Sequence, residues 1–131
     1  MNHRDSEVRR FNELTGKIIG CGIEVHKALG PGLLESIYEE CLCYELNQQG
    51  IEFERQKELP VHYKNVRLNS GYRIDVLVEN SVIIELKAVE HILPVHKAQI
   101  LSYMKLLNSK IGLLMNFNVP VLKDGITRFV L

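Results

Sequence analysis

Three charged residues stand inside otherwise apolar runs and have the types that metal-assisted chemistry needs. Asp75 lies in the run 71–78, and Glu85 and Lys87 lie in the run 82–89, which gives the spacing D-x9-E-x-K. Carboxylate oxygens are the ligands that Mg²⁺ and Mn²⁺ prefer, and a neighbouring lysine can hold or polarise a water molecule. Because unpaired buried charges are costly, we expect these side chains to pair with one another or to bind a cation.

Both runs are rich in β-branched residues and predict two adjacent strands joined near Glu79-Asn80-Ser81. Because alternate residues of a strand share a face, Glu85 and Lys87 should project together. A two-residue loop would pair Asp75 with Leu86 on the wrong face, whereas a three-residue loop places it opposite Glu85. We therefore predict an odd-length loop or a bulge. The alternative interpretation is a salt-bridge cluster on a strand surface.

The elements that position these residues follow from the spacing of apolar residues and from glycine and proline. Helices are predicted over 6–29 and 32–49, separated at Gly30-Pro31-Gly32, because glycine suits a helix end and proline a first turn. Strands are predicted over 51–54 and 59–63, then the hairpin, a helix over 94–107, and strands over 111–117 and 125–131. This order predicts a mixed sheet flanked by helices, of α/β or α+β class, in one domain over residues 1–131.

Composition excludes several classes of protein. Hydrophobic residues make up 46% and charged residues 24% of the 131 residues, which is typical of a globular domain and excludes a disordered chain. No apolar run approaches the roughly 18 residues that span a bilayer, and the polar N-terminus lacks the apolar segment of a signal peptide. Three cysteines without metal-ligand spacing indicate reduced thiols. We therefore expect a cytoplasmic protein without membrane contact.

Charge is balanced in total but uneven along the chain. Sixteen basic and sixteen acidic residues give zero net charge, which does not indicate a strong nucleic-acid binder. Residues 94–131, however, hold five basic residues and only Asp124 as an acid. We expect a surface facing a polyanion to use this part of the chain, with Lys97 and Lys105 as candidate contacts to phosphates. The alternative is an ordinary solvated face.

Two predicted helices carry further polar residues at helical spacing. Glu35 and Tyr38 are three residues apart, and Gln99 and Tyr103 are four apart, so each pair can share a face and both could point into one cleft. Gly32 would allow an anion to approach the backbone near a helix start. The structural alternatives are an exposed first-turn position for Glu35 and core positions with satisfied hydroxyls for the tyrosines.

These residues resemble known nuclease motifs. Asp75 with Glu85-Leu86-Lys87 is similar to the signature of the PD-(D/E)XK nuclease superfamily, although Ile74 stands where the named motif has proline. The segment 32–38, Gly-Leu-Leu-Glu-Ser-Ile-Tyr, resembles the motif of the GxxExxY protein family, a branch of that superfamily. The segment 99–103, Gln-Ile-Leu-Ser-Tyr, is similar to the Q-x-x-x-Y helix of RecB-like nucleases. The superfamily core order α-β-β-β-α-β resembles the order predicted over residues 32–117.

The resemblance implies a restriction-endonuclease-like core with an extra N-terminal helix and an extra C-terminal strand. It also implies roles for the motif residues: Asp75, Glu85 and the backbone carbonyl of Leu86 as ligands of Mg²⁺ or Mn²⁺, Lys87 as the catalytic lysine, Glu35 as an auxiliary acid, Gln99 and Tyr103 as further catalytic residues, and Gly32 and Tyr38 as motif residues at the cleft. None of these roles follows from composition or spacing alone.

The function implied is hydrolysis of phosphodiester bonds in DNA or RNA by water activated at one or two Mg²⁺ ions. Two alternatives are open. One is a catalytically idle binding or assembly module with the same fold, which the zero net charge and small size favour. The other is a metal-dependent hydrolase of a small phosphate ester. A homodimer is expected on geometric grounds, because one small domain contacts a duplex from one side only.

Overall fold

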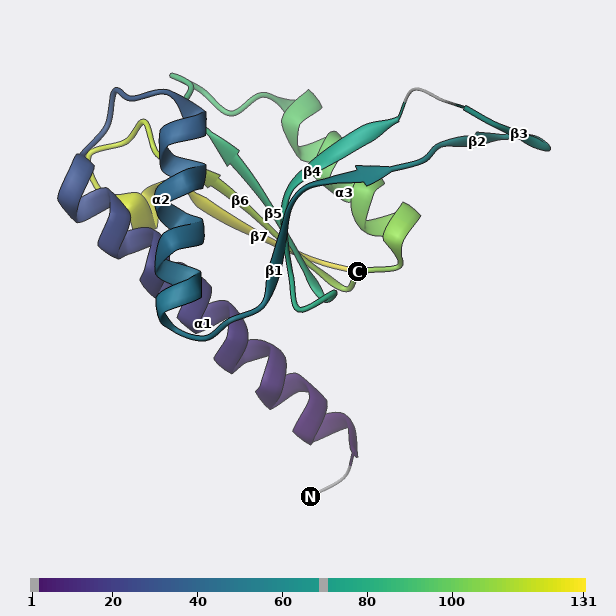
Figure 1. Ribbon diagram of the computed structural model, residues 1–131, viewed down its shortest axis with the longest axis horizontal. Helices are drawn as coiled ribbons and strands as arrows, with labels where there is room; N and C mark the ends of the chain where they lie inside the picture. Colours follow the sequence, from purple (N-terminus) through teal and green to yellow (C-terminus); the bar gives the residue numbers. More distant parts are fainter. Residues whose placement is uncertain (1–2, 69–70) are drawn as a thin grey trace.

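A five-stranded sheet with the order β1-β4-β5-β6-β7 lies between helices on both faces (Figure 1). The computed structural model describes residues 3–68 and 71–131, with side chains from Ser6 onward. The strands are β1 Phe53–Leu59, β4 Tyr72–Val78, β5 Val82–Lys87, β6 Ile111–Asn116 and β7 Ile126–Val130. Strands β5 and β6 run parallel, and the other neighbours are antiparallel. This mixed sheet confirms the predicted architecture.

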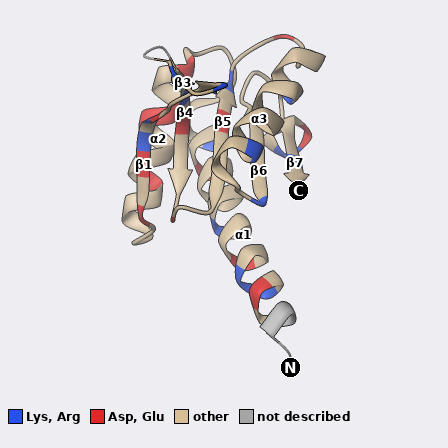
Figure 2. Cartoon of the chain, turned by 90° about the vertical axis from the view of Figure 1, so that its right-hand side faces the viewer, with Lys and Arg blue, Asp and Glu red and all other residues tan. Residues whose placement is uncertain are grey.

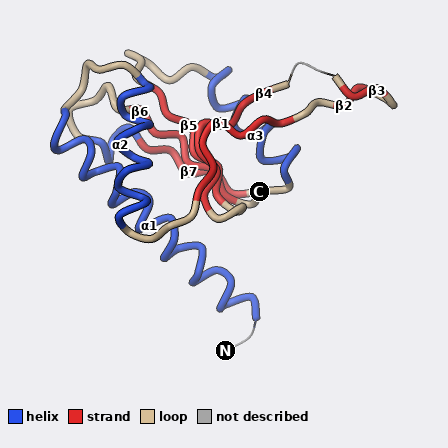
Figure 3. The backbone as a smooth tube through the Cα atoms, in the orientation of Figure 1, coloured by secondary structure: helices blue, strands red, loops and turns tan. Residues whose placement is uncertain are grey.

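Helices α1 (His3–Leu29) and α2 (Glu35–Gln48) cover one face of the sheet, and α3 (Pro94–Leu107) covers the other (Figure 3). Each face has its own apolar core. Ile84 and Leu86 of β5 belong to the core beneath α1 and α2, whereas Ile83 belongs to the core beneath α3 with Ile100 and Tyr103. Because the even-numbered residues of β5 face α1 and α2, Glu85 and Lys87 fall on the α3 side, as predicted.

The turn between α1 and α2 is longer than predicted, because α2 begins at Glu35 instead of residue 32. Gly30 and Gly32 have φ values of 70° and 97°, in the left-handed region that favours glycine and cannot continue a helix. Leu34, the residue before the helix, is extended. A Cβ at Gly32 would meet no heavy atom within 4 Å, so this position requires glycine for its φ angle.

A short projecting hairpin was missed at the sequence level. Strand β1 is continuous over seven residues, and strands β2 (His62–Tyr63) and β3 (Val66–Arg67) form a separate two-stranded sheet that extends away from the core (Figure 1). Two-residue strands contain too little alternation for a pattern to reveal. We call residues 61–68 the arm.

Helix α3 and the strands that follow it lie where the sequence predicts them. The helix begins at Pro94 and ends at Asn108, whose φ of 54° is the left-handed conformation common after a helix. A 3-10 turn, η1 (Leu122–Gly125), precedes β7. Within the described residues, no helix is both long and apolar enough to cross a membrane.

Candidate active site

The β4–β5 hairpin brings the two predicted acids to adjacent positions. Val76 pairs with Ile84 and Val78 with Val82, so the loop is the three-residue segment 79–81. Glu79 and Asn80 both adopt positive φ angles, of 48° and 53°. The odd-length loop predicted from the positions of the charges is therefore confirmed. The register would next bring Asp75 opposite Glu85, and Figure 2 shows acidic segments at the same level on β4 and β5.

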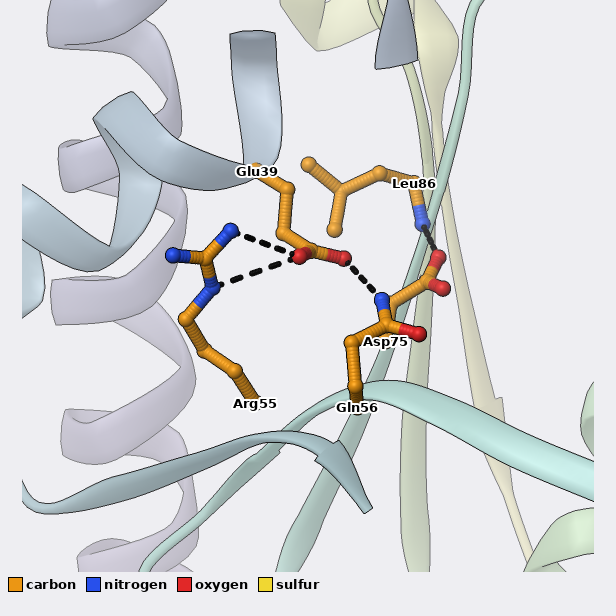
Figure 4. Close-up of polar contacts among 5 residues, drawn as sticks. All are labelled: Glu39, Arg55, Gln56, Asp75 and Leu86. Atoms are coloured by element: carbon orange, nitrogen blue, oxygen red, sulfur yellow. Dashed lines mark hydrogen bonds and ion pairs between the residues drawn. The ribbon is translucent and has the colours of Figure 1, made fainter. Parts of the chain in front are cut away.

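At this point the ladder of backbone hydrogen bonds stops, and side chains take its place. The N–H of Asp75 donates to Oε1 of Glu85 at 3.2 Å, and the N–H of Leu86 donates to Oδ2 of Asp75 at 2.9 Å (Figure 4). Each carboxylate thus accepts a backbone amide of the opposite strand. Because both bonds run between β4 and β5, they fix the positions of the two carboxyl groups before any ligand binds.

The strand alternation breaks around Asp75. Ile74 and Leu77 contribute to the core under α3, whereas Val76 and Val78 contribute to the core under α1 and α2. In the neighbouring strand, Gln56 has a φ of 51° and interrupts the β1–β4 pairing. This irregularity lets the Asp75 carboxylate reach the Leu86 amide, although strict alternation would direct it differently from Glu85.

Burial gives the acid pair unusual electrostatics. Desolvation and the negative charge of Asp75 raise the pKa of Glu85 from its ordinary value of 4.5 to about 9. A hydrogen bond between the two carboxyl groups also raises this pKa, whereas the Asp75 amide and the charge of Lys87 lower it. Without a cation the pair therefore retains one proton at neutral pH. This is the behaviour of two close carboxyl groups that cannot both be charged.

Lys87 lies near Glu85 at the end of β5, and the chain after it is clamped by a buried asparagine. The N–H of Phe117 donates to the Lys87 carbonyl at 2.8 Å. Asn116, which is opposite Lys87 in the parallel pair, accepts from the Val89 N–H at 3.1 Å and donates to the Val89 carbonyl at 3.0 Å. Sequence reasoning missed Asn116, whose signal was one amide inside the apolar segment 111–117.

Tyr103 reaches the site from α3. Desolvation raises its pKa to about 12, and the nearby charges of Glu85 and Asp75 contribute to the rise. Its ring lies 5.4 Å from the ring of Tyr72, the first residue of β4, at an angle of 51°. Gln99 is half-buried one helical turn before Tyr103. The structure thus brings together Asp75, Glu85, Lys87 and Tyr103, with Gln99 on the adjacent turn.

The polar network of α2 uses a different acid from the predicted one. Glu39, which is buried, accepts from Nη2 of Arg55 at 2.9 Å and from Nε2 of Gln56 at 2.7 Å (Figure 4). Gln56 stands beside Asp75 in this view, so Glu39 supports the neighbour of a site residue. Glu35 is exposed in the first turn. Sequence reasoning missed Glu39, since charged residues on helices are usually exposed.

Tyr38 is a structural residue and does not line a cleft. Its fully buried hydroxyl donates to the Gly30 carbonyl at 2.6 Å and accepts from the Leu33 N–H at 3.1 Å. Its ring stacks on Phe117 with centroids 4.5 Å apart. Tyr38 and Tyr103 lie on opposite faces of the sheet, so the expectation that both helical pairs point into one cleft is wrong. The expected anion contact at Gly32 also lacks its helix start.

The donor set fits a small divalent cation. Asp75 and Glu85 offer hard carboxylate oxygens, and the proton that they share occupies a position that a cation could take. No further acid, histidine or cysteine completes a group of three around them within the described residues. Remaining ligands would therefore be backbone carbonyls, water and substrate, as is usual for Mg²⁺. Lys97 and Lys105 are exposed on α3.

Comparison with known proteins agrees with this geometry. A family model described as the PD-(D/E)XK nuclease superfamily matches residues 12–129. Searches of curated proteins and of solved structures each returned no match. Nucleases of this superfamily generally use divalent metal ions such as Mg²⁺. The matched range includes the acid pair and most of the restriction-endonuclease-like sheet, and it shows that this chain belongs to the PD-(D/E)XK nuclease superfamily.

Proposed function

We propose that this chain is a metal-dependent nuclease that hydrolyses phosphodiester bonds of nucleic acid. The observation that carries the proposal is the buried acid pair, which shares a proton although its two carboxylates are already held by backbone amides. A folded protein gains little stability from such a pair, whereas a divalent cation would stabilise both carboxylates as anions. The neighbouring lysine completes the chemistry that hydrolysis of a phosphodiester needs.

The residues of the chain would divide the work. Asp75, Glu85 and the Leu86 carbonyl would hold Mg²⁺ or Mn²⁺, which when bound would stabilise negative charge on a phosphate oxygen. Lys87 would hold the attacking water beside the acid pair. Tyr103 would donate its hydroxyl proton to a phosphate oxygen, because its raised pKa keeps it protonated, and Gln99 would orient the same group.

We assign the chain further to the GxxExxY branch of the superfamily. The φ angle at Gly32 and the hydrogen bonds of Tyr38 support a structural meaning for two positions of that motif, namely closure of the α1–α2 turn. Glu35 stays a predicted auxiliary acid, and Lys97 and Lys105 stay predicted phosphate contacts. The single domain over 1–131 and the homodimer are proposals on the same footing.

The first test separates a metal site from a structural charge cluster. Titration with Mg²⁺ or Mn²⁺ should raise the melting temperature of the wild type, by about 3 kcal/mol of stability at a hundredfold excess over Kd. Asp75→Ala and Glu85→Ala should lose this response, whereas Glu35→Ala, the matched control with an exposed acid, should retain it. An equal response in all four proteins would refute the metal site.

The second test concerns the substrate. Single-stranded and duplex DNA and RNA are incubated with protein and Mg²⁺, together with a small phosphodiester. Lys87→Ala should reduce nucleic-acid cleavage by at least a hundredfold and leave the metal-induced rise in melting temperature in place. Cleavage of the small ester alone would replace the nuclease by a phosphoesterase. Metal binding without any cleavage would favour the binding module.

A further inference from the structure

The arm carries a concentration of positive charge that the rest of the first ninety-three residues lacks. Residues 59–74 contain Lys64, Arg67 and Arg73 and not one aspartate or glutamate, although residues 1–93 as a whole carry a net charge of −4. The chain is neutral in total, so this local charge did not appear in the composition. A polyanion is the partner that such a segment favours.

Aromatic rings accompany these cations and remain accessible. Tyr63 is 63% exposed, and the Nζ of Lys64 lies 5.4 Å from the centre of its ring. Tyr72 is 48% exposed at the base of the arm. Exposed rings bracketed by cations form the platform on which the bases of a single strand stack. Recognition of a duplex backbone needs cations but leaves such rings without a partner.

A cavity of about 620 Å³ at the base of the arm joins these features to the acid pair. Arg67, Tyr72 and Arg73 line it, and this volume falls in the range of pockets that hold small ligands, which leaves room for a nucleotide. Glu58 also lines the cavity and lies 3.8 Å from Arg73, but both side chains are exposed, so the ion pair is weak. The arm and α3 project on the same side of the sheet (Figures 1 and 2).

The path from this cavity to the acids is short. Tyr72 stands three residues before Asp75 in β4, which is about 10 Å along a strand. The Tyr72 ring also contacts Tyr103, whose hydroxyl lies within the electrostatic influence of the acids. A strand that occupies the cavity therefore has a route along the α3 side of the sheet toward Asp75 and Glu85.

We propose that the arm and the cavity at its base bind single-stranded nucleic acid, with bases on Tyr63 and Tyr72 and phosphates at Lys64, Arg67 and Arg73. This inference deepens the proposed nuclease function and rests on it for the identity of the ligand as a substrate. Binding itself requires only the rings and the cations, so it can be measured without any cleavage.

The test measures binding of a fluorescein-labelled oligothymidylate by fluorescence anisotropy in EDTA, where the proposed chemistry cannot proceed. Tyr63→Ala should weaken binding about tenfold through lost stacking. The double variant Lys64→Ala, Arg67→Ala should lower the slope of log K against log salt by about 1.4, or roughly 0.7 for each phosphate contact. A labelled duplex of equal length should bind the wild type more weakly than the single strand.

Matched controls lie elsewhere on the surface. Tyr44 on α2 is 61% exposed, so Tyr44→Ala removes a ring of equal accessibility without touching the arm. Lys17→Ala, Lys110→Ala removes two exposed cations, one on α1 and one at the far end of β6. Both controls should bind as the wild type does. All variants change exposed side chains, and circular dichroism checks that they fold.

The outcomes separate this proposal from the nuclease proposal. Binding through the arm without cleavage in Mg²⁺ would overturn the nuclease and leave the arm proposal standing. Cleavage and binding that are unchanged in the arm variants would overturn the arm proposal and leave the nuclease. Absence of oligothymidylate binding by the wild type, preference for the duplex, or a dimer in sedimentation that only arm variants disrupt would each overturn the arm proposal.

Discussion

Glu85 is the residue whose ionisation couples the site to stability. Its pKa is raised from 4.5 to about 9 in the folded protein, so between these values the folded state binds a proton that the unfolded state has released. The free energy of unfolding should therefore fall as pH rises through this window. In urea titrations with EDTA, Glu85→Gln should flatten this slope, whereas Glu35→Gln should keep it. A wild-type slope of the opposite sign would contradict the shared proton.

Tyr38 shows how one motif residue can be structural. Tyr38→Phe removes the hydroxyl that holds Gly30 and Leu33 and leaves the ring on Phe117. The buried backbone groups lose their partner, so stability should fall by about 1–3 kcal/mol in urea unfolding. The melting-temperature response to Mg²⁺ should be unchanged. Loss of that response at normal stability would show instead that Tyr38 acts at the metal site.

The acid pair could be predicted from residue types, but its supporting residues could not. Asp75, Glu85 and Lys87 are charges in apolar strands, which alone makes them anomalies. Glu39 and Gln56 have ordinary polar surroundings in the sequence, and only the packing of α2 against β1 joins them. Gln56 also adopts a left-handed conformation that is rare for a residue with a side chain.

At the scale of elements, helix α3 is seated on β6 through a glycine. A Cβ at Gly112 would lie 2.7 Å from Sδ of Met104 and 3.1 Å from Cδ1 of Ile100. Gly112→Ala should therefore lower stability by about 1–3 kcal/mol and displace the helix that carries Tyr103. Chemical denaturation measures the first effect, and the nuclease assay the second. Unchanged stability would mean that Met104 and Ile100 move aside at no cost.

Gly20 provides the opposite case within α1. A Cβ at this exposed helical position would meet no heavy atom within 4 Å. Alanine is a better helix former, so Gly20→Ala should raise stability by about 1 kcal/mol. The two substitutions make the same chemical change, and their opposite signs should follow from the surroundings alone. Destabilisation by Gly20→Ala would indicate a neighbour that the structure does not contain.

Element boundaries were predictable where local chemistry decides them. Pro94 and Asn108 delimit α3 as expected, and the three-residue hairpin loop follows from the requirement that the acids meet. The start of α2 was wrong because two glycines adopt angles that a proline at the first turn does not reveal. The arm was missed because its strands are too short for a period to develop.

For the whole molecule, the match to the nuclease superfamily spans both cores and every strand of the large sheet. The composition was neutral and therefore silent about partners, since total charge averages over separate surfaces. Acidic segments at the middle of the sheet and the basic arm beside it cancel in the sum. The expected basic surface in residues 94–131 and the proposed basic arm are distinct, and the salt dependence of their variants distinguishes them.

Strand β7 protects its neighbour from self-association. Every residue of β6 is buried, and β7 covers its outer edge with a strand that carries Thr127 and Arg128. A chain that ends at Gly125 would present an apolar edge with free amide and carbonyl groups, which is a template for cross-chain pairing. Such a truncated protein should aggregate, with light scattering that grows with concentration. A clear solution of the truncated chain would show that another segment guards this edge.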